Sequence, residues 1–549
     1  MLTLSVDLRA GTGPWQWCEQ GGGCWARGED RIRPLANAAL EARAVTDGTA
    51  TLMVVRERAA GRPSLLRSTA PVRVDAAVYA RALEECRQWP LQSVWIEAGP
   101  DGLRLKTGLG GVCPLYLAHA AGRLTGSWQL MDLKAHQSPG RLDEKEVMRL
   151  LTGHPRYGHD TLFTSIKRLS ERSSAYADAE GLRLVYPAAA EHAQPSDLAE
   201  GTDGATLVGA FEALVDHIYA RRPLTPARTA AQLSGGKDST NLAISLALAH
   251  PGLITPCALL IGGEAGPQQV ARRRMVIDHT GFAPDVTVPA ADHPPLAPGS
   301  LRRAHPEAVS PLDEPHLEAA DALAQALMAR GITMVVAGFG GDEVARVRRP
   351  DGGPLRTPEA PAWCGERVHD LLSEVNTSIS PATVAPETAL VALEVATPLL
   401  ARRGLWTVAP FTDPELVRFG QRLPLEWKRD KKLLTERFAA RGLPDEVVHP
   451  VLRENFGHLM NHAVEQYATG LLRGWGKDLH LIDQGYLDAA VLNETVERAA
   501  LGPKEAAPYR TGLFLITAIE LALRALQTPV HHARDFDSKG PSAPPDAPG

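Results

Sequence analysis

The sequence predicts two folded regions of different class: a strand-rich α+β region over residues 1–195 and an α/β region over 200–530. In the first, short apolar runs alternate with Gly, Pro and Asp turns. In the second, apolar runs alternate with helical patterns, which indicates a parallel sheet covered by helices, followed by a mainly helical part. Between them, the segment from Pro187 to Pro195 has no periodicity, so we place the linker there, running to about Gly201.

Composition excludes several classes of protein. The 549 residues include 58 basic and 64 acidic side chains, a net charge of −6, which argues against a dedicated nucleic-acid binder. The six cysteines form no CxxC pair, as expected for reduced thiols rather than a disulfide scaffold or a zinc site. No stretch reaches the ~18 apolar residues of a membrane span, and no signal peptide is visible. We therefore expect a cytoplasmic protein without a membrane partner.

In the N-terminal region, five apolar runs predict strands, and two segments predict helices. The helices are expected near Asp75–Arg87 and Asp143–Leu151. The runs that predict strands are Leu2–Leu8, Ala50–Val55, Ser93–Glu97, Leu103–Lys106 and Pro114–Ala118.

The C-terminal region alternates between the two kinds of element. Helices are predicted at Leu207–Arg221, Ser239–His250 and Leu317–Arg330, with Gly331 at the position of a C-cap glycine. The apolar runs that predict parallel strands are Arg228–Leu233, Leu253–Ile261 and Ile332–Ala337. Residues 380–530 are predicted to be mainly helical, and the Pro-rich tail 531–549 to be disordered.

The segment Ser234–Ser239, SGGKDS, carries the strongest chemical signal. It follows a predicted buried strand ending at Leu233 and opens a predicted helix. Glycines allow close approach of the backbone to a phosphate, and helix N-terminal amides bind anions. Asp238 has the side chain that a magnesium ion on phosphate oxygens requires. The spacing differs from both GxxxxGK[ST] and GxGxxG.

A second glycine turn strengthens this interpretation. GFGGDE, Gly338–Glu343, follows the predicted strand Ile332–Ala337. Ligands of open α/β sheets gather at the carboxyl ends of strands, so Asp238 and Asp342 are predicted to hold one Mg²⁺-pyrophosphate. The candidate ATP and pyrophosphate site comprises Leu233, Ser234, Gly235, Gly236, Asp238, Ser239, Gly338 and Asp342. Between the two turns, the segment Pro311–Pro315 is either part of a site or the capped start of a helix.

These motifs together resemble the class B asparagine synthetase family of N-type ATP pyrophosphatases. The order SGGxDS, DEP, GxGxDE is followed by Lys431-Lys432-Leu433-Leu434 and Gly442-Leu443-Pro444, similar to that family's Lys-x-Leu-Leu and Leu-Pro segments. Gly111–Tyr116 and Asp160–Leu169 resemble parts of its glutaminase domain. The resemblance implies an Ntn-hydrolase-like, degenerate glutaminase domain followed by a synthetase domain that uses ATP and Mg²⁺.

Two departures narrow the expected activity. Glutamine-hydrolysing members expose a nucleophilic cysteine after removal of Met1, whereas this sequence has Leu2 there. Phe339 stands where the asparagine synthetases of the family have Glu and the β-lactam-forming members have Tyr. The resemblance is therefore closest to the cyclases that close lasso peptides by an isopeptide bond. A small-molecule lactam or amide synthetase, an RNA-modifying enzyme and a non-catalytic scaffold remain the alternatives.

The resemblance also implies a mechanism and partners. A carboxylate of a precursor core peptide is adenylated, and the peptide's own N-terminal amine closes the macrolactam. A leader-peptide protease and a leader-recognition protein are the expected partners, and no nucleic acid is. Arg453, in the segment VLRENFGH, and Lys431 are the candidate catalytic cations beside the leaving phosphate.

Overall fold

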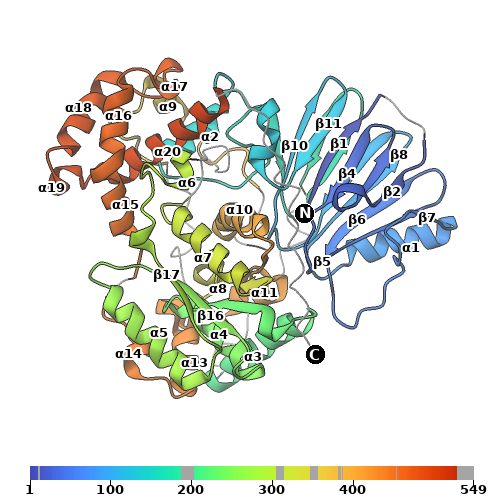
Figure 1. Ribbon diagram of the computed structural model, residues 1–549, viewed down its shortest axis with the longest axis horizontal. Coiled ribbons are helices and arrows are strands. Elements are labelled where there is room, and N and C mark those ends of the chain that lie inside the picture. Colours follow the sequence, from blue (N-terminus) through green and yellow to red (C-terminus); the bar gives the residue numbers. More distant parts are fainter. Residues whose placement is uncertain are drawn as a thin grey trace, which may run out of the picture.

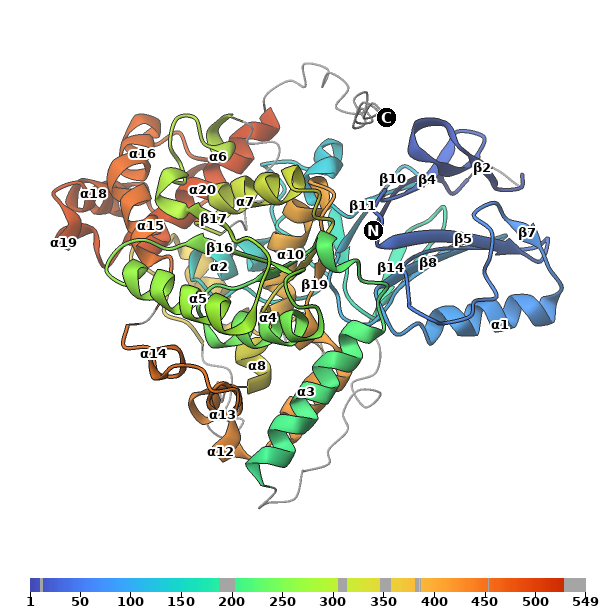
Figure 2. The same ribbon diagram turned by 60° about the horizontal axis from the view of Figure 1, so that its bottom comes forward.

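The computed structural model describes residues 1–9, 13–186, 203–304, 314–345, 357–380, 385, 387–452 and 454–527. Its N-terminal half consists of two packed sheets and its C-terminal half of a parallel sheet with helices (Figures 1 and 2). The predicted linker and the tail 531–549 lie outside the described residues, so the domain bounds stay predictions. Within the described part, no helix has the length and apolar character needed to cross a bilayer.

The two N-terminal sheets each have seven strands that pair antiparallel, apart from β7, which lies parallel to β5. Their inner faces share one apolar core that includes Leu4, Trp25 and Ile96. The first sheet, in spatial order, is β12 (Ile166–Leu169), β10 (Leu115–Ala120), β11 (Arg123–Ser127), β1 (Leu2–Asp7), β4 (Asp30–Pro34), β3 (Cys24–Arg27) and β2 (Gln16–Cys18). The second is β14 (Leu182–Val185), β13 (Ser174–Ala177), β9 (Gly102–Thr107), β8 (Ser93–Gly99), β6 (Thr51–Glu57), β5 (Leu40–Thr46) and β7 (Val72–Arg73).

Helices cover the outer faces of both sheets. α1 (Ala76–Arg87) packs Tyr79, Ala82 and Cys86 against β5, β6 and β8. On the other side, β10 shares a core with α2 (Glu144–Leu151) and with the C-terminal helices. The predicted α+β layer structure is confirmed in this coarse form, while its relation to Ntn hydrolases stays an expectation.

The C-terminal half contains a five-stranded parallel sheet in the order β17-β16-β15-β18-β19. One face carries α3 (Gly204–Ala220), α4 (Lys237–Ala249), α11 (Pro414–Arg422) and α13 (Lys432–Ala440), and the other carries α7 (Leu317–Ala329) and α10 (Glu387–Arg402) (Figure 2). The strands are β15 (Thr229–Gln232), β16 (Thr255–Leu260), β17 (Val286–Pro289), β18 (Met334–Val336) and β19 (Trp406–Val408). The predicted parallel sheet is therefore confirmed.

The remaining helices form the C-terminal part that the sequence predicts to be helical. They are α15 (Gly457–Ala463), α16 (Thr469–Trp475), α17 (His480–Asp483), α18 (Ala489–Ala499), α19 (Pro503–Ala506) and α20 (Arg510–Gln527). They pack on one another and several contact α20, away from the parallel sheet (Figure 1). α20 in turn contacts α2, and α2 contacts α9 (Glu366–Leu371). Among the described residues, five other helices belong to this half. α5 (Gly266–Thr280) is long, and the four short ones are α6 (Leu301–Ala304), α8 (Gly341–Ala345), α12 (Leu425–Lys428) and α14 (Asp445–Val448).

A buried polar contact joins the two halves. Glu394 of α10 accepts a hydrogen bond from Tyr116 Oη at 2.6 Å and forms an ion pair with Arg168. All three side chains are almost fully buried, and removing one partner of such a pair leaves the other charge uncompensated. The N-terminal half therefore supports a helix that lines the site described next.

Candidate active site

The loop between β15 and α4 is built to hold an anion. β15 ends at Gln232, and α4 begins at Lys237 with Gly236 as its N-cap and no capping side chain. The first amides of this 13-residue helix therefore have no side-chain acceptor from the cap, and they favour a bound anion. Gly235 has φ +92°, and a Cβ there would lie 3.1 Å from Glu454 Oε2, so both its conformation and its surroundings favour glycine.

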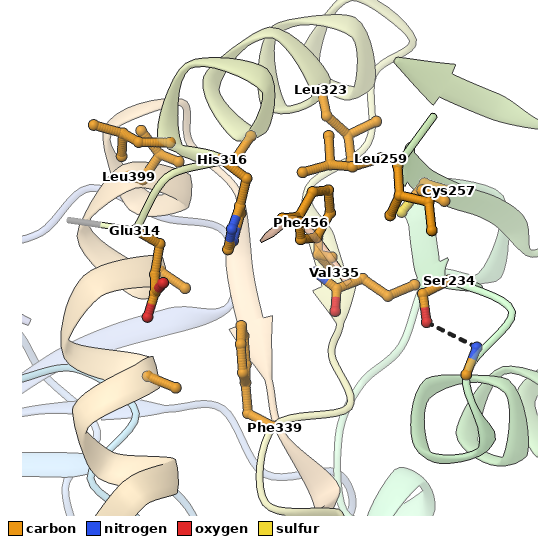
Figure 3. Close-up of a pocket in the computed structure, with 18 of the residues that line it drawn as sticks. Ser234, Cys257, Leu259, Glu314, His316, Leu323, Val335, Phe339, Leu399 and Phe456 are labelled. Atoms are coloured by element: carbon orange, nitrogen blue, oxygen red, sulfur yellow. Dashed lines mark hydrogen bonds between the residues drawn. The ribbon is translucent and has the colours of Figure 1, made fainter. Parts of the chain in front are cut away.

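Hydrogen bonds within the loop fix its shape. Ser234 Oγ lies 2.8 Å from Ser239 Oγ and accepts a hydrogen bond from the Gly236 amide at 3.2 Å (Figure 3). Gln269 Nε2 donates to the Ser234 carbonyl at 2.8 Å. The loop is thus ordered before any ligand arrives, which reduces the cost of binding. One detail of the prediction is wrong: α4 starts two residues before Ser239, because the Ser234 hydroxyl closes the turn early.

The second glycine turn packs directly against the first. It follows β18, and α8 begins at its Gly341. A Cβ on Gly338 would lie 2.8 Å from the Ser239 amide nitrogen, and one on Gly341 would lie 2.4 Å from Asp238 Cγ. Both glycines are therefore required by close packing of the two turns rather than by backbone conformation.

Strand order explains why these two turns meet. From β15 the chain proceeds to β16 and β17 on one side, and then to β18 and β19 on the other. Adjacent strands whose connections leave in opposite directions create a crevice at their carboxyl ends, where open α/β sheets bind ligands. SGGKDS follows β15 and GFGGDE follows β18, so the structure brings the two predicted turns to that crevice.

Lys431 lies between the two predicted magnesium ligands. Its Nζ forms an ion pair with Asp238 and another with Asp342 Oδ1 at 2.8 Å. Lys431 and the preceding Asp430 both have left-handed backbones, with φ of +57° and +50°. Such conformations cost about 1–3 kcal/mol each and persist where the surroundings hold them.

A second lysine holds this strained segment. Lys237 Nζ donates to Thr435 Oγ1 at 2.7 Å, and Thr435 Oγ1 donates to the Lys431 carbonyl at 3.1 Å. Burial lowers the pKa of Lys237, and the nearby charges of Lys431 and Arg272 lower it further. The first turn of α4 is thereby tied to the residues that place Lys431.

The two aspartates suit a magnesium ion that also binds phosphate. Asp238 Oδ1 is buried and accepts no hydrogen bond in the described structure, and burial raises the pKa of this carboxyl although Lys431 opposes the shift. No group of three His, Cys, Asp or Glu side chains suited to a metal occurs among the described residues. Mg²⁺ commonly takes one or two carboxylates and completes its shell with waters and substrate phosphates, so this pair fits it.

An apolar cavity of about 480 Å³ adjoins the loop (Figure 3). It lies between α7, α10 and the ends of β15, β16 and β18, and Ser234 and Gly236 form part of its wall. Phe339 and Phe456 line it, and His316 stacks on Phe456 with ring centroids 4.7 Å apart. Burial lowers the pKa of His316 to about 4, which keeps its imidazole neutral at physiological pH.

Several residues of this region were not among the site residues predicted from the sequence. Arg272 forms an ion pair with Glu454 at 2.8 Å, and Gln269 closes the loop, but neither lies in a motif. Glu314 and His316 point into the cavity (Figure 3), and the DEP-like segment was the available signal for them. Arg453 and Asp313 lie outside the described residues, so the structure does not place these two.

Two cysteines, Cys257 and Cys113, lie in enclosed surroundings. Cys257 is fully buried, and burial raises the pKa of its thiol to about 12. Beside Cys113, in the N-terminal half, the cavity is only about 10 Å³. Such a volume holds about one water molecule. Leu2 is buried in β1.

Comparison with models of known protein families gives a match to part of the chain. Residues 390–524 match the family model of asparagine synthase. The match supports an asparagine synthetase-like region and, with it, ATP-dependent amide-bond ligase chemistry. It covers α10, Lys431 and the C-terminal helices but neither glycine turn. A search of curated proteins found no match to the chain.

Proposed function

We propose that this protein is a lasso peptide cyclase. It uses ATP to activate the side-chain carboxylate of an Asp or Glu in a core peptide and joins it to the peptide's N-terminal amine. The observation that carries the proposal is the convergence of two Asp-bearing glycine turns and Lys431 beside an apolar cavity. ATP and Mg²⁺ are the expected cofactors, and AMP and pyrophosphate the expected products.

The phosphate loop performs the first task, which is charge neutralisation. The first amides of α4 and the hydroxyls of Ser234 and Ser239 receive the phosphates, and Lys431 adds a positive charge. Asp238 and Asp342 would hold Mg²⁺, which neutralises charge on the pyrophosphate. The substrate carboxylate then attacks the α-phosphorus, and pyrophosphate leaves.

The cavity performs the second task, which is to keep the activated acyl group away from water. Its lining is mainly aliphatic and aromatic, and Phe339 has no hydroxyl or carboxylate to act as a base. A dry wall reduces hydrolysis of the acyl-adenylate and favours the folded form of an apolar peptide. The amine then attacks the acyl carbon, and AMP leaves.

An N-terminal half that supplies no ammonia would require an amine on the substrate itself. Leu2 stands at the position of the glutaminase nucleophile, and the neighbouring cavity is too small for glutamine. A precursor peptide whose leader has been removed supplies such an amine. We therefore also propose that a leader-peptide protease and a leader-recognition protein act before this enzyme.

The test uses synthetic peptides with a free N-terminus and one internal Asp or Glu at successive positions. The proposal expects a product lighter than the linear peptide by one water, formed only with ATP and Mg²⁺. Acetylation of the N-terminus should abolish that product and leave adenylation intact, because the amine enters in the second step. Turnover of free aspartate with ammonia, or of a small β-amino acid, at rates matching every peptide would contradict it.

A further inference from the structure

Glu314 provides a carboxylate to the cavity that the phosphate site does not use. The side chain projects from the segment before α7 towards Phe339, and Leu399 of α10 lies across from it (Figure 3). The other acidic residue of the cavity wall, Glu454, accepts hydrogen bonds from Arg272 Nη1 at 2.8 Å and Gln268 Nε2 at 3.2 Å. Glu454 therefore already has its partners.

The carboxylate of Glu314 has no hydrogen-bond or ion-pair partner among the described residues. No described side chain or amide donates a hydrogen bond to it, and none forms an ion pair with it. Arg302, whose charge acts on the Glu314 carboxyl, binds Glu318 Oε2 at 2.5 Å and the Glu314 main-chain carbonyl. Desolvation by the cavity wall raises the pKa of Glu314, and the charge of Arg302 opposes this shift.

The Glu314 side chain is exposed to the space of this mainly apolar cavity, so a ligand that enters the cavity can reach its carboxylate. The complement of a carboxylate is a cation with hydrogen-bond donors, and the proposed reaction brings one, because its nucleophile is an amine that is protonated in water. His316 lies beside Glu314 (Figure 3), and burial lowers its pKa to about 4, so its imidazole is neutral at physiological pH and does not provide the cation that would pair with the carboxylate.

We propose that Glu314 forms the subsite for the substrate's primary ammonium group and accepts its proton before amide formation. This inference rests on the proposed function for the second step, although the binding subsite itself does not. The ammonium gives one proton to the carboxylate, which becomes the neutral acid. The neutral amine nitrogen bonds to the acyl carbon, the bond from that carbon to the AMP oxygen breaks, and the second nitrogen proton passes to water.

The position of Glu314 suits this order of events. The cavity it faces also contains Ser234 and Gly236 of the phosphate loop, so an amine held there lies in the same space as the activated acyl group. Holding both reactants in one site converts a bimolecular step into an effectively unimolecular one. The apolar wall provided by Phe339 and Leu399 would pack the carbon chain that carries the amine.

Binding of a probe tests the subsite without any knowledge of the natural peptide. Phenethylammonium, a primary ammonium with an apolar arm, is titrated into the full-length protein and followed by calorimetry. Wild type should bind it, Glu314→Gln should bind it at least tenfold more weakly, and Glu314→Asp should retain part of the affinity. Glu264→Gln, which removes an exposed carboxylate outside the cavity, should bind like wild type. Equal binding by wild type and Glu314→Gln, or no binding by wild type, would overturn the inference.

Turnover then separates this inference from the proposed function. With a peptide that wild type cyclises, Glu314→Gln should retain ATP–pyrophosphate exchange and lose at least tenfold in amide formation. Hydroxylamine, which is uncharged at neutral pH, should still trap the acyl-adenylate in this variant. Loss of exchange would show that Glu314 contacts the nucleotide instead. Phenethylammonium binding without cyclisation of any peptide would refute the cyclase and leave the amine subsite standing.

Discussion

Replacing Lys431 by Met tests the electrostatics of the candidate site. In wild type the Lys431 ammonium pairs with Asp238 and, at 2.8 Å, with Asp342. Without the ammonium, Asp238 and Asp342 repel each other, and Asp238 loses its compensating charge. This loss matters because the Asp238 side chain is only 22% exposed and water solvates it poorly. Unit charges at about 4 Å interact by about 4 kcal/mol near a protein surface.

Solvent reduces the effect that remains. The Asp342 side chain is 38% exposed, so its pair with Lys431 is screened and contributes little by itself. We therefore expect the variant to lose about 1–3 kcal/mol of unfolding free energy without Mg²⁺, mostly through Asp238. Mg²⁺ at millimolar concentration should restore much of this loss, because a metal ion that binds only the folded state stabilises it. The unfolding free energy of wild type should rise less, because Lys431 already compensates the two carboxylates.

Urea denaturation with and without Mg²⁺ measures both effects. Lys477→Met is the matched control, because Lys477 is exposed and far along the chain from the site. Equal stability of Lys431→Met and wild type without Mg²⁺ would refute the electrostatic reasoning. An equal shift of both proteins by Mg²⁺ would refute the assignment of the metal to these aspartates.

Three further predictions concern the reaction. Asp238→Asn should lower pyrophosphate release a few hundredfold, about 3–4 kcal/mol of transition-state stabilisation, in a protein whose circular dichroism is unchanged; near-normal release would remove Asp238 from the mechanism. Gly341→Ala should raise the KM for ATP or abolish activity, because the new Cβ would meet Asp238 Cγ at 2.4 Å, and an unaltered KM would show that the two turns can separate. Glutamine should yield no glutamate above background, with or without substitution of Cys18 or Cys24, and glutamine-dependent product would contradict an inert N-terminal half.

Local motifs predicted which two turns would meet at the candidate site, because each motif lies in one short segment of the sequence. SGGKDS and GFGGDE each follow an apolar run, and the parallel order of the strands brings their carboxyl ends together. The run Ile332–Ala337 was longer than the strand Met334–Val336, because its ends belong to the adjoining turns. Residues with no motif, such as Gln269 and Arg272, become part of the site only through tertiary packing, which a single sequence does not encode locally.

Some structural features contradict simple expectations from the sequence. Asp238 was placed in the loop before a helix predicted to begin at Ser239, but it lies in the first turn of α4, where the second glycine turn packs against it. β19 was missed because three residues, Trp406–Val408, are too few to show a period inside a helical region. β2 and β3 were missed for the same reason, because they have only three and four residues, and β4, DRIRP, was missed because Ile32 is its one aliphatic side chain besides Pro34.

The fate of one carboxylate oxygen tests the central claim, that the enzyme activates an acid by adenylation. A peptide that the enzyme cyclises is prepared with isotopically labelled oxygen in its acceptor Asp or Glu side chain, and the nucleotide products are analysed by mass spectrometry. Attack on the α-phosphorus predicts the label in AMP, with unlabelled pyrophosphate. Label in inorganic phosphate together with ADP would show acyl-phosphate chemistry and would contradict the account.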